Sequence, residues 1–414
     1  RDLHSFPTRR SSDLQSSSLL CGICTAFVSC GGSKRISSVQ SDVLFELEYG
    51  NFDNQINMFD VSRVGSIDTS IAMRDGFFYI ANSESKKIME LNSYGDLLTI
   101  YYNEDFNPVP SFSKGTDGTS ATRKAVSYPF NNIKAVSVDS RKYLYAVDVL
   151  PQERREYDEE KKMSLAQVVL RFDASGKFLD YIGQQGPGGT PFPFIKNIYT
   201  TNASELVVVC TTGDGFQVYW FSTDGYLMYA VPVKKENVPN PFKDEKNDTF
   251  FSVENIVPDY NERKLYLKAD YFESYTDEAS RVQSGIDYKC TLVHPLSVET
   301  GEYEKSVAIP AYSEEIAQGF SKVEYEIPYD FLGVTENNWM FFIVNAEDGM
   351  NVQMVQVDGQ RILKRQIPVS RTDNLYYTFS LSNTGIISAL LVQKDSAKVG
   401  WWRTDSLIQS VINN

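Results

Sequence analysis

Histidine and cysteine, which supply many of the bases, nucleophiles and metal ligands of proteins, are scarce in this 414-residue chain. The two histidines are His4 and His294. His4 lies in a first segment with no structural pattern, so only His294 is left to serve a folded site. A histidine-rich zinc site or a pair of histidine bases cannot be built from one imidazole. Because His294 precedes Pro295 at the end of a strand-like run, we expect it to be structural or solvent-exposed.

Other catalytic motifs are missing or lie in unsuitable surroundings. No GxSxG nucleophile elbow occurs. Ser-x-x-Lys occurs at residues 83–86 and 111–114, but both copies lie in turn-like segments and lack the partner motifs SDN and KTG. The glycine-rich residues 183–189 lack the Lys-Ser/Thr that ends a phosphate-binding loop. The sequence therefore predicts no catalytic residue, no cofactor-binding residue and no assigned metal ligand.

Residues 19–28, LLCGICTAFV, form an apolar stretch that ends just before Cys30. This stretch has the length of the apolar region of a signal peptide and is too short to cross a bilayer. The residues Phe27-Val28-Ser29-Cys30 resemble the lipobox of bacterial lipoproteins, with Phe27 where that pattern prefers Leu. The resemblance implies that Cys30 is acylated and becomes the mature N-terminus, which anchors the protein to a membrane of the cell envelope.

The segment before this stretch, RDLHSFPTRRSSDL, has no helical or alternating apolar period. One reading frame of a common short-read sequencing adapter spells the same residues, so we exclude residues 1–14 from the analysis of the fold. We expect residues 15–29 to be a truncated signal peptide and residues 30–42 to be a flexible linker. Residues 43–414 are then the folded domain.

The composition limits both the partners and the fold. The formal net charge is −14, which disfavours nucleic acid as a partner because its binding needs clustered Lys and Arg. No apolar run after Cys30 is long enough to cross a membrane as a helix. Tyr and Phe, 25 of each, favour strands. Cys210 and Cys290 lie in strand-like runs, so we expect buried thiols, or a disulfide if those strands meet.

A glycine turn between two strand-like runs recurs along the chain, as in LNSYGDL, FDASGKF and FSTDGYL. In each copy the glycine supplies the positive φ of a tight hairpin, and a nearby polar side chain can bond its own backbone. This pattern is typical of the outer hairpin of a propeller blade. The turn glycines are Gly95, Gly176, Gly225, Gly301 and Gly359.

A second hairpin pattern recurs and predicts the inner two strands of each blade. It occurs six times, at residues 70–83, 133–148, 195–211, 253–270, 325–344 and 377–393. The sequence therefore predicts an all-β fold, a six-bladed β-propeller of four-stranded antiparallel blades, with seven blades as the alternative. Because a blade needs ~40–50 residues, the longer intervals must contain insertions, among them residues 151–164 and 273–284.

The two ends of the folded domain are predicted to meet. The last blade supplies strands at 377–383, 385–393 and 399–405, and the alternating run 43–49 comes before the first inner strand. We expect residues 43–49 to pair beside the C-terminal strands, because an open ring would leave exposed sheet edges.

The strands resemble those of NHL-type β-propellers, and more narrowly those of a group of uncharacterised bacterial lipoproteins with an NHL-like propeller. The resemblance rests on RDGFFYIAN and KIMEL at residues 74–82 and 87–91, and on YLYAVD and VLRFD at residues 143–148 and 169–173. It implies a scaffold that binds partners and no agreed activity.

A metal-dependent hydrolase acting on lactones or esters is the alternative function. Propellers of that kind hold a divalent metal in the axial channel through inward-facing side chains of different blades. The side chains expected at this channel include Asn132, Asn197 and Glu254, each near the start of an inner strand. No recognisable ligand motif supports the site.

We expect an envelope-anchored, non-catalytic scaffold whose partner is an unidentified envelope protein. The charge-dense insertion 151–164 is the first choice for the contact, through Tyr157, because loops on a rigid scaffold tend to carry function. Trp401 and Trp402 are a second choice, and alternation predicts one ring inward and the other outward. Binding of a carbohydrate or another small ligand through exposed aromatic side chains is a weaker alternative.

Overall fold

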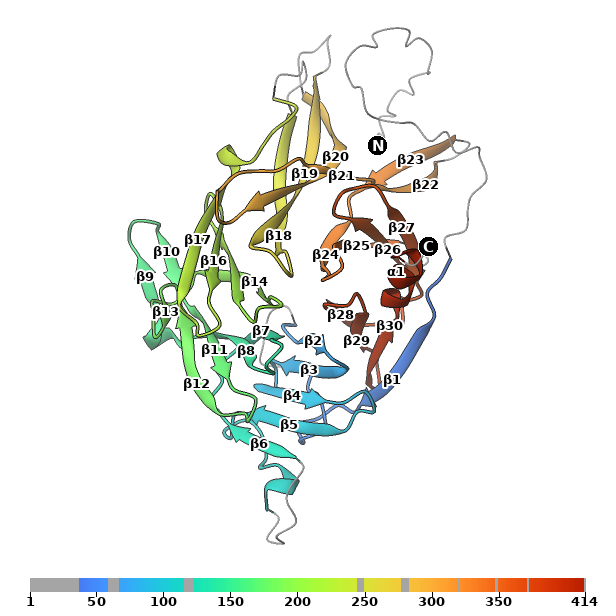
Figure 1. The fold of residues 1–414 in the computed structure, drawn as a ribbon. Coiled ribbons are helices and arrows are strands. Elements are labelled where there is room, and N and C mark those ends of the chain that lie inside the picture. Colours follow the sequence, from blue (N-terminus) through green and yellow to red (C-terminus); the bar gives the residue numbers. More distant parts are fainter. Residues whose placement is uncertain are drawn as a thin grey trace, which may run out of the picture. The chain divides into compact units, whose positions relative to one another are not determined.

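Six antiparallel sheets surround a central axis like the blades of a wheel (Figure 1). The structure is a computed structural model that describes residues 37–58, 67–114, 123–243, 249–276, 283–318, 321–346, 349–370 and 372–412. All of them belong to one compact unit, residues 36–414. A second unit, residues 1–35, lies outside the described residues, and so do the adapter-like segment, the export segment and Cys30. The fold is the predicted six-bladed β-propeller.

The first two blades each carry a short fifth strand. Blade 1 contains β2 (Ser70–Arg74), β3 (Phe77–Asn82), β4 (Lys87–Leu91) and β5 (Leu97–Tyr102), with β6 (Lys124–Ser127) parallel to β5. Blade 2 contains β7 (Ile133–Val138), β8 (Leu144–Val149), β11 (Gln167–Phe172), β12 (Phe178–Gly183) and β13 (Gly186–Pro187).

The next two blades have four strands each. Blade 3 contains β14 (Phe194–Thr200), β15 (Leu206–Thr212), β16 (Gly215–Phe221) and β17 (Leu227–Lys234). Blade 4 contains β18 (Thr249–Pro258), β19 (Lys264–Thr276), β20 (Gln283–Ser297) and β21 (Val307–Ile309). Strands β19 and β20 are much longer than the others, so part of blade 4 extends beyond the ring.

The fifth and sixth blades complete the ring, and the sixth contains strands from both ends of the compact unit. Blade 5 contains β24 (Asp330–Val334), β25 (Trp339–Ala346), β26 (Gly349–Gln356) and β27 (Ile362–Ile367). Blade 6 contains β28 (Tyr376–Leu381), β29 (Ile387–Val392), β30 (Ala397–Trp402) and, as its outer strand, β1 (Ser41–Leu47). The antiparallel pairing of β1 with β30 confirms the predicted closure of the ring.

The hydrophobic core is divided into six clusters, one between each pair of neighbouring blades. Side chains alternate along each strand, so a blade strand buries both of its faces. In β3, Phe78 and Ile80 pack toward blade 6, whereas Tyr79 and Ala81 pack toward blade 2. This burial explains why the inner strands are nearly continuous apolar runs.

All five predicted turn glycines, together with Gly385, have positive φ. At Gly225, with φ +89°, close packing adds a second requirement. A Cβ there would lie 2.6 Å from Cδ1 of Ile182 and 3.0 Å from Nη1 of Arg171, both in blade 2. The turn therefore fits against the next blade only because its residue has no side chain.

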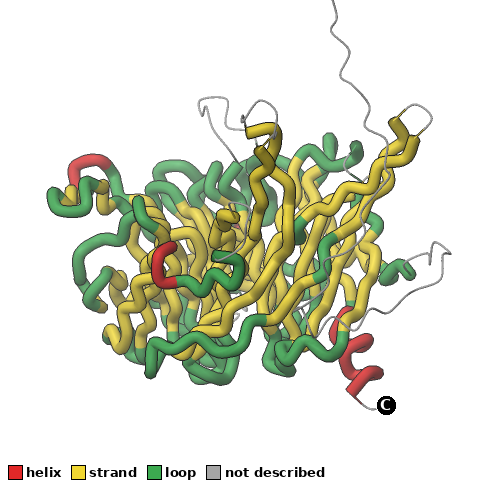
Figure 2. Tube along the Cα trace, turned by 90° about the horizontal axis from the view of Figure 1, so that it is seen from above, coloured by secondary structure: helices red, strands yellow, loops and turns green. Residues whose placement is uncertain are grey.

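The inserted segments project from one face of the ring. Because antiparallel strands alternate in direction, the second-to-third-strand connections and the links between blades lie on the face where the innermost strands begin. We call this the insertion face and the opposite one the turn face. The insertion face carries the hairpin of β9 (Glu156–Asp158) and β10 (Met163–Leu165), the extension of β19 and β20, and the hairpin of β22 (Tyr312–Gln318) and β23 (Ser321–Ile327) (Figure 2).

The insertions are more ordered than the sequence suggested. Residues 151–164, expected to be a loop, include a short 3₁₀ helix, Gln152–Arg154, and most of the β9–β10 hairpin. We had also placed Tyr325 in the innermost strand of blade 5, which was wrong. Pro328 interrupts strand pairing after β23, and the innermost strand starts at Asp330.

A C-terminal helix, α1 (Thr404–Ile412), replaces the end of the strand predicted at 399–405. The Thr404 hydroxyl donates to the Gly385 carbonyl, and the Ile408 side chain packs over the same turn. These contacts place α1 on the turn face (Figure 2). Two further 3₁₀ helices span Ser111–Lys114 and Lys235–Asn237.

Candidate functional site in the axial channel

The innermost strands of all six blades surround a cavity of about 440 Å³ on the axis of the ring. The strands that line it are β2, β7, β14, β18, β24 and β28. About half of the lining residues are apolar, and the neutral polar ones include Ser137, Asn197, Asn255, Thr378 and Ser380. A concave site on the axis, shared by all blades, is the place where a propeller can hold a small ligand.

Four of the six innermost strands contain a β-bulge. The pairing register shifts at Lys134 in β7, Lys196 in β14, Glu254 in β18 and Leu332 in β24. A bulge re-aims the side chain of its extra residue and increases the local twist. Two of these extra residues, Lys134 and Lys196, line the channel near its rim at the insertion face.

Each charge at this rim has a defined neighbour. The Lys134 ammonium forms an ion pair with the Asp68 carboxylate of blade 1. The Lys196 ammonium donates to the backbone carbonyl of Glu254, so blades 3 and 4 are linked through main chain. Burial raises the pKa of the Asp330 carboxyl, while Lys268 opposes that shift. The rim is therefore a ring of mixed charge.

At the turn face a hydrogen bond spans the channel. Nη1 of Arg74, at the end of β2, donates to the hydroxyl of Tyr260 at 2.6 Å. Arg74 belongs to blade 1 and Tyr260 to blade 4, which lie opposite each other in a ring of six. The Arg74 guanidinium carbon also lies 5.9 Å from the centre of the Tyr260 ring. This bridge crosses one end of the channel and fixes the guanidinium there.

The inner turns of neighbouring blades are linked around the same end. Ser140 and Ser204 hydroxyls lie 2.6 Å apart, which joins blades 2 and 3. Asn261 Nδ2 donates to the Glu336 carbonyl at 2.9 Å, and Asn383 Nδ2 donates to the Glu336 carboxylate at 2.9 Å. These bonds join blades 4, 5 and 6 and make the turn face a rigid base for the channel.

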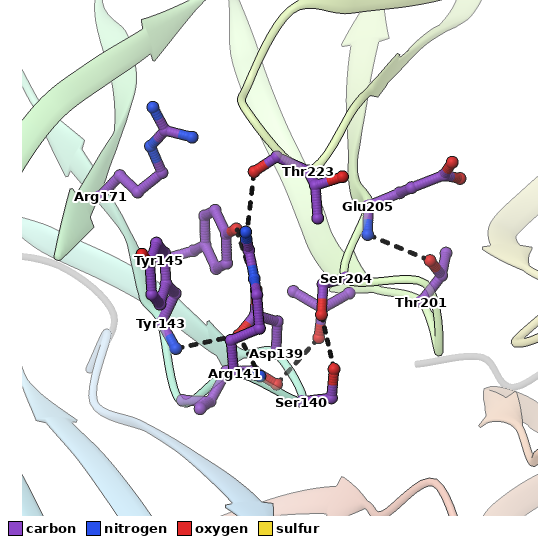
Figure 3. A network of polar contacts seen from close by, with 12 residues as sticks. Asp139, Ser140, Arg141, Tyr143, Tyr145, Arg171, Thr201, Ser204, Glu205 and Thr223 are labelled. Atoms are coloured by element: carbon purple, nitrogen blue, oxygen red, sulfur yellow. Dashed lines mark hydrogen bonds and ion pairs between the residues drawn. The ribbon is translucent and has the colours of Figure 1, made fainter. Parts of the chain in front are cut away.

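The turn of blade 2 shows how one of these links is built (Figure 3). Buried Asp139 accepts hydrogen bonds from the backbone N–H groups of Arg141 and Tyr143, each at 2.9 Å. Its carboxylate also pairs with the Arg141 guanidinium, which reaches the Thr223 carbonyl of blade 3 at 3.1 Å. The aspartate therefore fixes both its own turn and the contact to the next blade.

The side chains considered for a metal site have separate partners. Asn132 accepts from the Ser83 hydroxyl at 2.6 Å, Asn197 donates to Asn255 at 3.2 Å, and the Glu254 side chain is exposed. Within the described part of the chain, no group of three or more His, Cys, Asp or Glu side chains is arranged to hold a metal ion. Among the described residues, no cluster of carboxylate, thiol or imidazole side chains therefore supports the metal-hydrolase alternative.

The predicted partner residues lie in different environments. Tyr157, on the β9–β10 hairpin, is 57% exposed. Trp401 is half-buried beside the Arg403 guanidinium, and Trp402 is only 2% exposed in the core between blades 5 and 6. The two rings alternate as expected, but the buried Trp402 cannot serve as a surface contact, which corrects that part of the prediction.

His294 and the two strand cysteines are structural. His294 is buried in β20, and its Nε2 lies 2.8 Å from the Tyr271 hydroxyl. Burial lowers the pKa of His294 to about 4, so the imidazole is neutral near pH 7. Cys210 and Cys290 form no disulfide, and Cys210 is buried. Of the two outcomes left open for these cysteines, the structure has thiols and no disulfide.

Sequence analysis missed Arg74 and Tyr260. Both stand next to predicted inner turns, in the motifs RDG and PDYNER, and the turns themselves were recognised. Their pairing depends on blades 1 and 4 facing each other across the axis, which requires the number of blades and the position of each strand. A search for charged residues at the ends of innermost strands would have found Arg74.

Comparison with known proteins returned structures only. No family model and no curated protein sequence matches the chain. Solved structures to which it is similar include a streptogramin B lyase, at 12% identity and a TM-score of 0.36, covering 87% of this chain and 96% of the other. A gluconolactonase from Xanthomonas campestris has 11% identity, a TM-score of 0.37 and coverages of 90% and 99%. Hydrazine synthase of Kuenenia stuttgartiensis has 8% identity and a TM-score of 0.39, with coverages of 81% of this chain and 95% of the other.

The described residues contain no helix of the length and apolarity that a membrane crossing requires.

Proposed function

We propose that this protein is a non-catalytic β-propeller scaffold that binds a partner protein through its insertion face. We further propose that it is an NHL-like lipoprotein, tethered to the cell envelope through Cys30. The surface proposal rests on the arrangement of exposed apolar side chains. The tether rests on the lipobox-like sequence alone, so the two parts are tested separately.

An aromatic stripe on the extended part of blade 4 carries the proposal. Phe250 of β18 stands opposite Phe272 of β19, which stands opposite Tyr288 of β20. The ring centroids are 5.6 and 6.1 Å apart. Ile286 continues the stripe, because residues two apart on a strand share a face. Phe250 is 38% and Ile286 56% exposed, so the stripe is partly open to solvent.

The other projecting hairpins present exposed aromatic side chains on the same face of the ring. Tyr157 lies on the β9–β10 hairpin and Tyr325 on the β22–β23 hairpin, and both are exposed. Aromatic side chains are enriched in protein interfaces because they bury a large area at low entropic cost. Three projecting hairpins that carry such side chains around one rim are suited to a partner protein larger than the channel.

A capture experiment with matched variants tests this surface. The Ile286→Glu and Phe250→Glu variants place a charge on the stripe, whereas Tyr226→Glu and Tyr94→Glu alter exposed tyrosines in outer hairpin turns on the turn face. We expect wild type and the turn-face variants to retain the same protein from envelope extracts. The stripe variants should retain at least about tenfold less, because a buried unpaired charge costs several kcal/mol.

Two results would contradict the scaffold. One is equal capture by stripe and turn-face variants. The other is the absence of any captured protein together with turnover of p-nitrophenyl acetate or a δ-lactone by the purified chain, since that result supports a hydrolase. The tether is tested by detergent phase partition, in which wild type should enter the detergent phase and Cys30→Ser the aqueous phase.

A further inference from the structure

The lining of the axial channel is cationic although the whole chain is acidic. The chain has a net charge of −14. Among the described residues that line the cavity, three are basic, Arg74, Lys134 and Lys196, and one is acidic, Asp259. An excess of positive charge in a concave, partly desolvated site attracts anions more strongly than the same charge on an open surface.

The single acidic side chain, that of Asp259, accepts hydrogen bonds from its own turn. Asp259 is buried, and its Oδ1 accepts hydrogen bonds from the backbone N–H groups of Asn261 and Glu262, each at 2.8 Å. Its Oδ2 accepts from the Tyr266 hydroxyl at 2.9 Å. This carboxylate is therefore already satisfied and does not neutralise the basic residues across the channel.

The basic side chains differ in how far they are neutralised. Lys134 is paired with Asp68. Lys196 donates to the uncharged backbone carbonyl of Glu254. Arg74 has an exposed carboxylate beside it, Oδ2 of Asp75 at 3.7 Å from Nε, which is beyond hydrogen-bond distance. Lys196 also interacts electrostatically with the Asp330 carboxylate, so most of the uncompensated positive charge is carried by Arg74.

The Arg74 guanidinium has donors left for a ligand. Nη1 donates to the Tyr260 hydroxyl at 2.6 Å and reaches the Val138 carbonyl at 3.5 Å. Nε is buried and has no hydrogen-bond partner among the described residues. The Nε side of a guanidinium is one of the edges that binds a carboxylate or phosphate through two parallel hydrogen bonds. The Tyr260 bridge holds the group in place while leaving this edge unbonded.

A second buried donor on the same strand is also unsatisfied. Ser70 Oγ lines the channel and has no hydrogen-bond partner in the part of the chain that the structure describes. Ser70 and Arg74 are four residues apart in β2, so they share one face of the strand. Four residues along a strand span about 13 Å, so Ser70 lies toward the insertion face and the Arg74 guanidinium at the turn face. Because buried polar atoms are nearly always hydrogen-bonded, the unbonded Nε of Arg74 indicates a ligand at the turn-face end of the channel.

We propose that the axial channel binds a small oxyanion, a carboxylate or a phosphate group, at its turn-face end, with Arg74 as its anchor. The cavity of about 440 Å³ lies within the range of small-molecule sites. This site is separate from the aromatic stripe, which lies on the projecting part of blade 4. The protein can therefore hold an anion in the ring and a partner protein on the insertion face.

Calorimetric titration of the purified chain with citrate and with inorganic phosphate tests the site. We expect saturable binding of one anion per chain for at least one probe, and binding of only one of them assigns the ligand to carboxylates or to phosphates. Arg74→Gln should weaken binding by at least about tenfold, because it removes a charged bidentate donor. The control Arg154→Gln alters an exposed arginine of the 3₁₀ helix Gln152–Arg154 and should bind as wild type does.

Two further variants keep the test decisive if Arg74→Gln does not fold. Arg74→Lys keeps the charge but loses the planar pair of donors, and Tyr260→Phe removes the bond that holds the guanidinium, so each should weaken binding severalfold. Ile286→Glu should bind the anion normally, so failure of the channel site and failure of the partner surface are distinguishable. The proposal is overturned if neither probe binds, or if Arg74→Lys, Tyr260→Phe and Arg154→Gln all bind with wild-type affinity.

Discussion

At the scale of the residue, stability is concentrated in a few buried polar groups that join neighbouring blades. Glu205 of blade 3 accepts from Trp220 Nε1 at 2.6 Å and from Arg263 Nη2 of blade 4 at 2.8 Å. Arg263 also pairs with Glu299 at 3.3 Å, but that carboxylate is exposed. Arg263 therefore forms one ion pair with a largely buried carboxylate, that of Glu205, and a second with an exposed carboxylate, that of Glu299.

These two carboxylates give a matched comparison. We expect Glu205→Ala to lower the free energy of unfolding by about 2–3 kcal/mol, because it leaves the Trp220 donor buried without a partner and removes a partly buried ion pair. Glu299→Ala should change it by less than about 0.5 kcal/mol, since exposed pairs contribute little. Urea denaturation of both variants measures the difference, and equal losses would contradict the account.

Lys87 makes stability depend on pH. Its side chain is fully buried, its ammonium donates to the Phe52 carbonyl at 2.7 Å, and burial lowers its pKa to about 7. Between that value and the ordinary pKa of about 10.4, the unfolded chain binds more protons than the folded one, so Lys87 makes stability rise with pH. Over pH 7–8.5 the contribution approaches about 1.4 kcal/mol per pH unit.

Replacing Lys87 by Met isolates this contribution. The free energy of unfolding of wild type, measured in urea at several pH values from 7 to 8.5, should rise relative to that of Lys87→Met. Other titrating groups are common to both proteins and cancel in the difference. A difference that stays constant, or that falls as the pH rises, would show that the folded lysine does not titrate near pH 7.

At the scale of the element, the glycine turns fix how closely two blades approach. Gly225 and Gly301 both have positive φ, but a Cβ on Gly225 would meet blade 2, whereas one on Gly301 would have nothing within 4 Å. Gly301→Ala should therefore cost only about 1 kcal/mol of backbone strain, and Gly225→Ala about 2–4 kcal/mol through strain and overpacking. Thermal denaturation compares them, and equal losses would show that blade 2 yields at this contact.

The sequence predicted the hairpins because a hairpin depends on neighbouring residues only. Glycines such as Gly95 and Gly176 mark these turns because each turn requires a positive φ at that position. The hairpin at β22–β23 was missed because alternation there continues up to Pro328, and the proline that separates it from the innermost strand of blade 5 was overlooked. Helix α1 was missed because its stability comes from the contact of Ile408 with Gly385, which is distant in the sequence.

The candidate site was less predictable than the fold for the same reason. Of the three side chains expected at the channel from their strand positions, Asn197 lines the cavity, whereas Asn132 and Glu254 are not among its lining residues. Arg74 and Tyr260 were not linked, because their contact spans 186 residues and two opposite blades. Whether Trp402 can contact a partner depends on its burial. The dipeptide Trp401-Trp402 does not by itself show which of the two rings faces the core.

At the scale of the whole molecule, the ring depends on β1, which brings residues from the start and end of the compact unit into one blade. Glu46 stands opposite Lys398, and their side chains form an ion pair of 3.3 Å. A Glu46→Cys/Lys398→Cys variant should form a disulfide on oxidation, because facing residues of antiparallel strands lie within disulfide range. Peptide mapping detects it, and a control pair, Glu46→Cys/Lys177→Cys, should remain reduced.

The closed ring separates two proposed binding surfaces, the axial channel for an anion and the insertion face for a partner protein. Its base is fixed by the linked inner turns, its axis holds the Arg74 site, and its insertion face carries the projecting hairpins. A rigid scaffold of this kind can present the aromatic stripe without rearrangement on binding. The stripe is therefore the feature on which the proposed function depends most.

Site-specific photocrosslinking in the cells that make the protein tests that function most directly. A photoreactive phenylalanine analogue at position 286 samples the stripe, and the same analogue at position 226 samples the turn face. We expect one crosslinked protein partner from position 286 and none from position 226. Crosslinks from position 226 alone, the same products from both positions, or none from position 286 would contradict it.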